Sequence, residues 1–294
     1  MRIDSHFHIW DLQAHRFPWL QDGVPIRRIY GDTTALRRSY LLETYLQENT
    51  ATGVAGGVYV QCGMEPPLAE AKHISALLTE RAMPFAITGY VDFQSEEAPT
   101  RIADMAKIKG LKALRYTTAW HENPDLCFSA QPEALRSAQM RAAFEALQDQ
   151  GLRFEAMLHP AGAADLLTLI RACPKVPVVL NHMLLPFEID DPGLQHWRRA
   201  LRALAAEPRV FLKLSGIAMW APQWWRDGRQ DALLREAVAL FGAERCMIGS
   251  NAPVDGLHAT PAQTWAGFDR ALAPLSRTDR ELIFGGTARR FYDF

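Results

Sequence analysis

The 294-residue sequence lacks an excess of charge of either sign. Its 32 lysines and arginines are balanced by 33 aspartates and glutamates, for a formal net charge of −1. Chains that bind nucleic acid or anionic membranes usually carry a basic excess. The sequence also has no apolar run of the roughly 18 residues that a membrane-spanning helix needs. We therefore expect neither a nucleic-acid partner nor a membrane partner.

Cysteine is scarce and shows no pairing pattern. Cys62, Cys127, Cys173 and Cys246 are scattered, and none forms a Cys-x-x-Cys pair. Such spacing is typical of free thiols in a reducing compartment. The chain also enters a predicted strand within three residues of its first Met, which leaves no room for a signal peptide. We therefore expect a cytoplasmic protein.

The sequence has no Gly/Ser-rich linker, low-complexity tract or internal repeat that would divide the chain. Hydrophobic residues make up 48% and charged residues 22%, as in soluble globular proteins. A length of 294 residues fits two average domains or one large α/β barrel. We expect a single domain over residues 1–294.

Short apolar runs of the kind that form buried parallel strands recur eight times. Helical stretches separate most of them. In the clearest, Leu135, Ala138, Ala142 and Ala146 recur at three- and four-residue intervals. This alternation predicts an α/β fold, a (β/α)8 TIM barrel. The predicted strands are Ile3–Trp10, Ala55–Gln61, Phe85–Val91, Leu111–Tyr116, Arg153–Leu158, Val176–His182, Val210–Ser215 and Cys246–Ser250.

Three long loops follow the first, fourth and seventh predicted strands. They cover residues 11–40, 120–132 and 218–230. Loops at these positions would lie over the mouth of a barrel, where active sites sit. Their aromatic residues, which include Trp19, Trp120 and Trp220, could line an apolar substrate pocket or simply seal the rim.

Histidines gather at the C-terminal ends of the predicted strands, where active-site residues of this fold are found. His6 and His8 share one face of the first strand, because side chains alternate along a strand. Two such imidazoles suit a divalent metal or the developing charge of a hydrated carbonyl. The other candidates at strand ends are Gln61, Tyr90 or Asp92, Arg115, His159, His182, Lys213 and Ser250-Asn251.

Several motifs together resemble the amidohydrolase-related group (amidohydrolase 2) of the amidohydrolase superfamily. These TIM-barrel hydrolases include sugar lactonases and pyrone-dicarboxylate lactonase. The matching segments cover the chain from end to end in the expected order. They are residues 4–11 (DSHFHIWD), 17–20 (FPWL), 180–182 (LNH), 213–216 (KLSG), 245–254 (RCMIGSNAPV) and 286–292 (GTARRFY).

The resemblance implies roles for individual residues. His6 and His8 would be metal ligands or polarisers of a lactone carbonyl, and His182 would orient water or stabilise the oxyanion. Arg115 would hold a substrate oxygen or carboxylate, for which the guanidinium fork is suited; the alternative is an ion pair inside the barrel. Lys213 could likewise bind substrate or pair with a buried acid.

The strand-eight motif departs from the family pattern. The family's Gly-Ser-Asp, whose Asp is the general base, here reads Gly249-Ser250-Asn251. An amide cannot accept a proton from water at neutral pH. We favour His182 as the proton acceptor, with Asn251 orienting water or substrate. Asp255, or less favourably Asp92, could supply the carboxylate instead, or the protein could bind a lactone or carboxylate without turnover.

A catalytic metal would need at least three protein ligands and an open position. His6 and His8 give two, His159 could give the third, and zinc is the first choice because imidazoles suit it. The lactonase branch commonly lacks the strand-five ligand, and Asn251 removes an anionic one. We therefore expect no required metal, with zinc at these histidines as the alternative.

The expected function is hydrolysis of a cyclic ester, a sugar lactone or a carboxylated lactone, by water attack at the carbonyl. The alternatives are non-oxidative decarboxylation of an aromatic or muconate-type acid, and a catalytically weak barrel that binds a metabolite. The partner is a small-molecule substrate, and the protein is a monomer or homodimer. Predicted catalytic residues are His6, His8, His182 and Asn251, and predicted substrate-binding residues are Arg115, Lys213, Trp19, Trp120 and Trp220.

Overall fold

Eight parallel strands form one sheet in a computed structural model that describes residues 1–23, 27–81 and 83–294. The strands pair in chain order, each with the next, which is the topology of the predicted (β/α)8 barrel. Their bounds are β1 Arg2–Phe7, β4 Val54–Val60, β5 Phe85–Tyr90, β6 Leu111–Thr117, β7 Arg153–Met157, β8 Val178–Leu180, β9 Val210–Leu214 and β10 Cys246–Ile248.

The sheet is nearly closed by backbone contacts between its first and last strands. The amide of Asn251 donates to the carbonyl of His6, and the amide of His8 donates to the carbonyl of Ala252, each at 2.8 Å. Both contacts lie beyond the end of β10 and within one residue of the end of β1. Closure therefore brings the strand-one histidines against the strand-eight motif.

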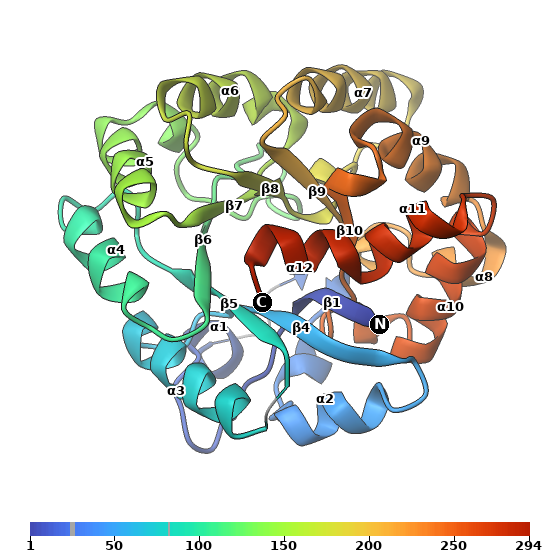
Figure 1. The fold of residues 1–294 in the computed structure, drawn as a ribbon, viewed down its shortest axis with the longest axis horizontal. Coiled ribbons are helices and arrows are strands. Elements are labelled where there is room, and N and C mark those ends of the chain that lie inside the picture. The colour runs from blue at the N-terminus through green and yellow to red at the C-terminus, as the bar shows by residue number, and fades with distance from the viewer. Residues whose placement is uncertain (24–26, 82) are drawn as a thin grey trace.

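Helices surround the sheet, as the strand–helix alternation predicts (Figure 1). In α5, Ser137 caps the start by accepting from the amide of Met140, and Gly151 ends the helix at a positive φ of 66°. The helices are α1 Pro18–Gln21, α2 Leu42–Glu48, α3 Pro67–Glu80, α4 Ala98–Ala106, α5 Ala138–Gln150, α6 Ala163–Ala172, α7 Asp191–Ala205, α8 Trp224–Asp227, α9 Asp231–Phe241, α10 Pro261–Leu272, α11 Arg277–Glu281 and α12 Thr287–Tyr292.

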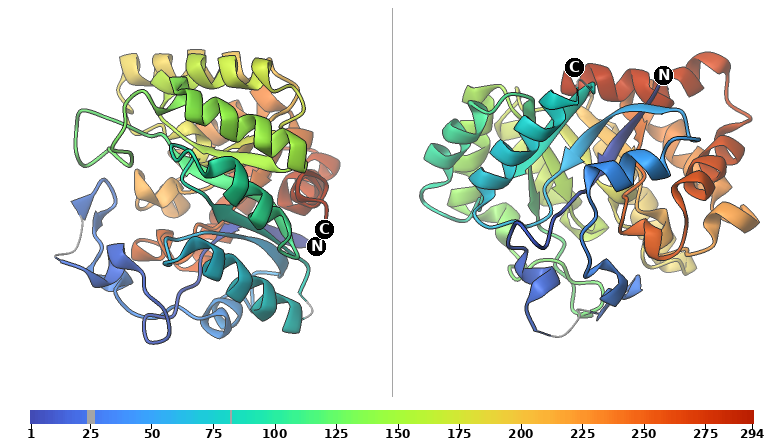
Figure 2. Two further views of the ribbon diagram at one scale, coloured as in Figure 1. Left: turned by 90° about the vertical axis from the view of Figure 1, so that its left-hand side faces the viewer. Right: turned by 90° about the horizontal axis from the view of Figure 1, so that it is seen from below.

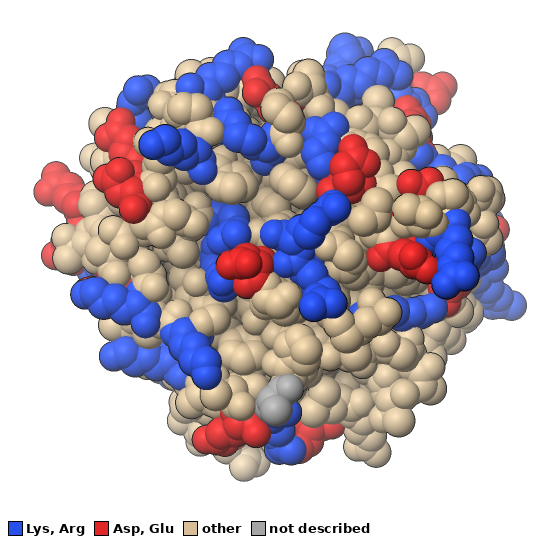
Figure 3. Space-filling model, in the orientation of Figure 1, with Lys and Arg blue, Asp and Glu red and all other residues tan. Residues whose placement is uncertain are grey.

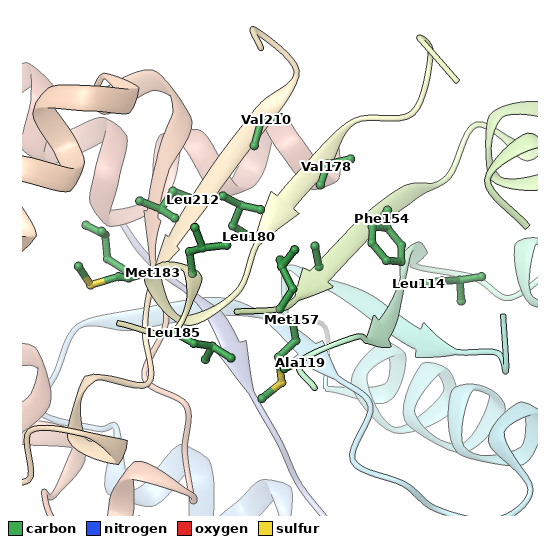
Figure 4. Packing of buried hydrophobic residues seen from close by; sticks show 14 of the residues in the cluster. Leu114, Ala119, Phe154, Met157, Val178, Leu180, Met183, Leu185, Val210 and Leu212 are labelled. Carbon is green, nitrogen blue, oxygen red and sulfur yellow. The ribbon is translucent and has the colours of Figure 1, made fainter. Parts of the chain in front are cut away.

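Two apolar layers hold the barrel together. The larger lies between the strands and the surrounding helices, and includes Leu114, Phe154 and Leu212 (Figure 4). The smaller fills the barrel interior, where strand residues meet Phe291 and Tyr292 of α12. Helix α12 lies across the end of the barrel at which both termini are found (Figure 1). This end is thus covered, and the opposite end is left for the loops.

The long loops emerge at the end opposite the termini (Figure 2). The loop predicted over residues 11–40 contains α1, a hairpin of β2 (Arg27–Arg28) and β3 (Gly31–Asp32), and a 3-10 turn at Thr34–Leu36. Residues 24–26 of this loop lie outside the described residues. Backbone hydrogen bonds between Trp10 and Tyr40 join the two ends of the loop.

Charges of both signs are interspersed on the face that carries the termini (Figure 3). This distribution agrees with the balanced net charge of −1. In the described part of the chain, we find no helix that is both long enough and apolar enough to cross a membrane.

Three predicted strands extend two or three residues too far at their C-terminal ends, and those that became β4, β5, β7 and β9 extend one residue too far. Ile3–Trp10 ends at Phe7, Val176–His182 is reduced to β8, and Cys246–Ser250 is reduced to β10. In the last two, the chain soon turns into left-handed backbone, with a φ of 52° at His182 and 55° at Asn251. A strand cannot continue through that conformation. These turns are where the candidate active site begins.

Candidate active site

A cavity of about 340 Å³ is lined by residues at or after the C-terminal ends of seven strands. This volume is in the range of small-molecule sites. The lining is largely aromatic and apolar, and its described residues include no Asp or Glu. They are His8, Trp10, Trp19, Arg28, Tyr30, Thr33, Gln61, Cys62, Gly63, Arg115, Thr117, Phe128, Met157, His182, Met219, Asn251 and Val254.

Three predicted histidines meet beneath this cavity. The ring of His6 lies 5.0 Å from that of His8 and 4.6 Å from that of His182, measured between centroids. His8 and His182 line the cavity, whereas His6 is fully buried and is absent from its described lining. The cluster is therefore confirmed as a structural unit, with His6 as its inner member.

The backbone at His182 takes an unusual course. Residues 182–185 all have positive φ values, from 48° to 62°, and none is glycine. The turn is held by the indole of Trp197, which donates to the carbonyl of Met183 at 2.7 Å. Met183 and Leu185 are packed in the same buried layer as Leu180 and Leu212 (Figure 4). Packing thus fixes the direction of the His182 side chain.

Gly216 makes room for the His182 ring. A Cβ at this position would lie 2.5 Å from Nδ1 of His182, and Gly216 itself has a φ of 63°. Both observations require glycine. The Lys213-Leu214-Ser215-Gly216 motif thus places the imidazole rather than reacting with substrate.

Hydrogen bonding fixes the tautomer of His8. Its Nδ1 lies 2.7 Å from the carbonyl oxygen of Val60, which can only accept, so Nδ1 carries the proton. Burial, followed by the charge of Arg115, lowers the pKa of His8 to about 3. Neutral His8 therefore has an unprotonated Nε2. This nitrogen cannot donate to an oxyanion, contrary to the electrophilic role predicted for His8.

The partner of His182 is Ser215. Nδ1 of His182 lies 3.0 Å from the Ser215 hydroxyl, which can donate to this nitrogen or accept from it. The imidazole also has a hydrogen bond with the backbone of Ser215. Burial and Arg115 keep the pKa of His182 well below its usual value, so its ring is neutral.

Asn251 is tied to a buried carboxyl. Its Nδ2 donates to Oδ1 of Asp255 at 2.7 Å, and the backbone amide of Ala218 donates to Oδ2 at 3.1 Å. Asn251 lines the substrate cavity, but Asp255 instead lines a neighbouring cavity of about 230 Å³. Asp255 is therefore placed to hold the amide of Asn251 rather than to meet substrate directly.

Asp255 makes stability depend on pH. Burial raises its pKa from 3.8 to about 7. Between these values the folded chain binds the proton and the unfolded chain does not, so stability falls as the pH rises through this window. We expect Asp255→Asn to be stabilised relative to the parent protein when the pH is raised from 5 to 8. Urea unfolding at both pH values measures this difference.

The control for Asp255 is Glu122→Gln at an exposed loop position. Its stability relative to the parent should be the same at pH 5 and pH 8. If Asp255→Asn behaves in the same way, ionisation of Asp255 is not coupled to folding.

Arg115 and Trp19 line the cavity as predicted for substrate-binding residues. Nη2 of Arg115 donates to the carbonyl of Gln61 at 2.6 Å, and its Nε has no partner among the described residues. The indole of Trp19 donates to the carbonyl of Cys62 at 2.6 Å. Backbone carbonyls after β4 therefore fix both side chains.

Lys213 does not reach the cavity. Its side chain is fully buried, and Nζ lies 2.7 Å from Oε2 of Glu155. Glu155 also accepts from Thr88, Asn181 and Tyr292. Of the two predicted roles of Lys213, the structure places it in the buried ion pair rather than against substrate.

Four other candidates lie away from the cavity lining. Trp120 is 39% exposed, and Trp220 is buried elsewhere. Nε2 of His159 is bonded to the carbonyl of Leu126 at 2.8 Å, and Asp92 accepts from the amide of Gln94. Trp120 and Trp220 are thus not brought to the substrate pocket, His159 does not join the other two predicted ligands, and Asp92 is not placed as a base.

Sequence reasoning missed Arg28, Tyr30 and Met219, which line the cavity from loops. Loop residues carry no periodic signal, so no pattern marks them. The contact between Asn251 and Asp255 could have been predicted from their spacing, because a turn brings residues four apart in the sequence together.

One observation favours a metal ion at the predicted histidines, and two count against it. In favour, both ring nitrogens of His6 are buried without a partner in the described residues. Against, no group of three His, Cys, Asp or Glu side chains in residues 1–23, 27–81 and 83–294 could hold an ion. The available imidazoles also lie near the positive charges of Arg115 and Lys213. As arranged, these residues do not fit a divalent metal, and we derive no step through one.

A parallel barrel with a histidine cluster at the C-terminal ends of its strands defines a class of barrel hydrolases. Within that class the family is clear, because the Amidohydrolase family model matches residues 3–294. The chain belongs to the amidohydrolase family.

Curated and solved relatives agree with this assignment. An L-fucono-1,5-lactonase of Burkholderia multivorans is 29% identical over 307 residues, covering 99% of this chain and 96% of that protein. A crystal structure of a Burkholderia multivorans amidohydrolase with bound HEPES has a TM-score of 0.82 and 26% identity. A second, with bound zinc, has a TM-score of 0.81 and 25% identity. Both structures cover 100% of this chain, which covers 99% of each.

Proposed function

We propose that this protein is a lactonase that opens a cyclic ester by water attack at the carbonyl carbon. The observation that carries the proposal is the pair of neutral imidazoles, His8 and His182, that line one cavity, with the Nδ1 proton of His8 held by the Val60 carbonyl. His8 then offers a lone pair at Nε2, and in the proposed mechanism the Ser215 hydroxyl donates to Nδ1 of His182, so that Nε2 of His182 offers a proton. Ester hydrolysis needs both, a base for water and a donor for the oxyanion. The similarity to the L-fucono-1,5-lactonase described above supports the same reaction.

In the proposed mechanism, Nε2 of His8 accepts a proton as the oxygen of water bonds to the carbonyl carbon. The carbonyl oxygen becomes an oxyanion, to which Nε2 of His182 donates. When the intermediate collapses, the ring C–O bond breaks and His8 returns its proton to the leaving alkoxide. The product is a hydroxycarboxylate, and one proton is released to solvent.

The roles of the two histidines are reversed relative to the sequence prediction. The reason is the pair of fixed Nδ1 partners, the Val60 carbonyl and the Ser215 hydroxyl. Asn251 takes no proton in this mechanism, and its amide, held by Asp255, orients water or substrate. His6 supports both rings from beneath.

A purified-protein panel of lactones, read by acid release with a pH indicator, tests the proposal. We expect release from at least one lactone, and we expect release to survive treatment with a chelator, with metal content measured in the same samples. Loss of release on chelation would contradict the metal-free mechanism. No release from any lactone, with carbon dioxide formed from an aromatic or muconate-type acid, would identify a decarboxylase instead. Thermal stabilisation by a lactone without turnover would identify a binding protein.

A further inference from the structure

The charged side chains in the described lining of the cavity are all positive. Two guanidinium groups, of Arg28 and Arg115, contribute to it, and its described residues include no carboxylate. No acidic side chain of the described chain lies within ion-pair distance of either guanidinium. His8 and His182 are neutral and add no charge. The formal charges of the described lining are therefore all positive, although Glu155 and Glu70 outside the lining act on Arg115.

Arg115 lies at the barrel end of the cavity. Its single hydrogen bond in the described residues uses Nη2, and its buried Nε has no partner there. An arginine presents a flat edge of N–H donors that fits a carboxylate with two parallel bonds. Arg115 thus keeps donors that a substrate oxygen can use.

Arg28 reaches the same cavity from the loop hairpin. Nη1 donates to the carbonyls of Cys127 at 2.7 Å and Pro124 at 3.2 Å, and the guanidinium carbon lies 5.1 Å from the ring centre of Phe128. These contacts join two loops, those after β1 and β6, and hold the charge in place. A charge that is already positioned loses little entropy on binding an anion.

The rest of the lining is mainly aromatic and apolar. Much of the wall is formed by Trp10, Trp19, Phe128, Met157 and Met219, and the polar residues Thr33, Gln61 and Thr117 carry no charge. The uncharged amide of Asn251 agrees with an anionic substrate, because a carboxylate at this position would repel such a substrate in the same cavity.

We infer that the substrate is an anionic lactone, with its carboxylate held between Arg28 and Arg115 and its ring against the aromatic wall. This inference rests on the proposed function for the reaction, and on the two arginines for the substrate class. Arg28 is then a specificity-determining residue that acts in binding rather than in chemistry.

The first experiment compares two lactones that differ only in charge, 5-oxotetrahydrofuran-2-carboxylate and its carboxamide. We expect kcat/KM of the parent enzyme to favour the carboxylate by about 10-fold or more, the effect of one charge-assisted hydrogen bond. Arg28→Gln should remove most of this preference through KM, with a much larger loss on the carboxylate than on the carboxamide. Arg28→Lys should restore part of it, since the charge returns without the fork.

Arg16→Gln is the matched control, because Arg16 is an exposed arginine of the same loop that pairs with Asp22 outside the cavity. It should leave both lactones unaffected. Equal use of the two lactones by the parent enzyme would overturn the inference. So would an equal loss on both lactones in Arg28→Gln, which would indicate a structural role for Arg28.

The second experiment uses 2-hydroxyglutarate, the product of the charged lactone, as a probe whose binding needs no turnover. Calorimetry should show binding to the parent protein and about 10-fold weaker binding to Arg28→Gln. If this holds while no lactone is opened, the anion site stands and the lactonase proposal falls. If lactones are opened without charge preference and the probe does not bind, the lactonase stands and the anion site falls.

Discussion

Replacing His8 by alanine will lower kcat by about 10²- to 10⁴-fold, the usual contribution of a positioned general base. Nε2 of His8 is its unprotonated nitrogen, because the Val60 carbonyl holds the proton on Nδ1. Alanine removes the acceptor without filling its place, so water must attack without a base. Steady-state kinetics on a lactone found in the panel measure the loss, and KM should change much less than kcat.

Glutamine variants separate the two histidines. A glutamine side chain can still donate a hydrogen bond but is not a base at neutral pH. His182→Gln should therefore retain more activity than His182→Ala, whereas His8→Gln should be no better than His8→Ala. The control is His196→Ala in α7, which should be fully active. If glutamine instead retains activity at position 8 and not at position 182, His182 is the general base.

Replacing Lys213 by methionine will destabilise the protein by about 3–5 kcal/mol, as expected when one partner of a buried ion pair is removed. Both Lys213 and Glu155 are completely buried inside the barrel. Burial alone would raise the pKa of Glu155, but Lys213 and neighbouring hydrogen bonds keep it below its usual value. Without Lys213 the carboxylate is left charged in a site that water cannot reach. Urea unfolding at neutral pH measures the loss.

The double variant Lys213→Met/Glu155→Gln tests the cause of that loss. Glutamine removes the uncompensated charge, and Oδ1 of Asn181, which has no partner in the described structure, can accept from its amide. We expect the double variant to recover at least half of the lost stability. A double variant no more stable than the single one would show that lost packing, not charge, is responsible.

The barrel could be predicted from the sequence because its strands are short apolar runs separated by helices. The C-terminal ends of the strands could not be predicted in the same way. The predicted strand Val176–His182 begins with an apolar run that leads into the Leu180-Asn181-His182 motif, yet β8 covers only Val178–Leu180. The left-handed turn that follows is held by Trp197 from α7, a tertiary contact that local pattern does not reveal.

The residues of the candidate site could be predicted where a sequence motif marks them. Their orientation and protonation could not, because these depend on contacts between residues far apart in the sequence. The His6-x-His8 motif and His182 identify the cluster. The proton positions depend on Val60 and Ser215, which are ordinary strand-end residues in the sequence. Similarly, nothing near Lys213 in the sequence indicates its partner Glu155, 58 residues earlier. Arg28 was missed because its position depends on two loops meeting.

The four consecutive left-handed residues at 182–185 leave little freedom for engineering heat resistance into this part of the barrel. Each such residue costs about 1–2 kcal/mol relative to ordinary backbone, and glycine would relieve that cost. All four side chains are buried, however, and removing one such as Leu184 would cost about 2–5 kcal/mol. The turn that aims the imidazole of His182 therefore cannot be relaxed by glycine without a net loss of stability.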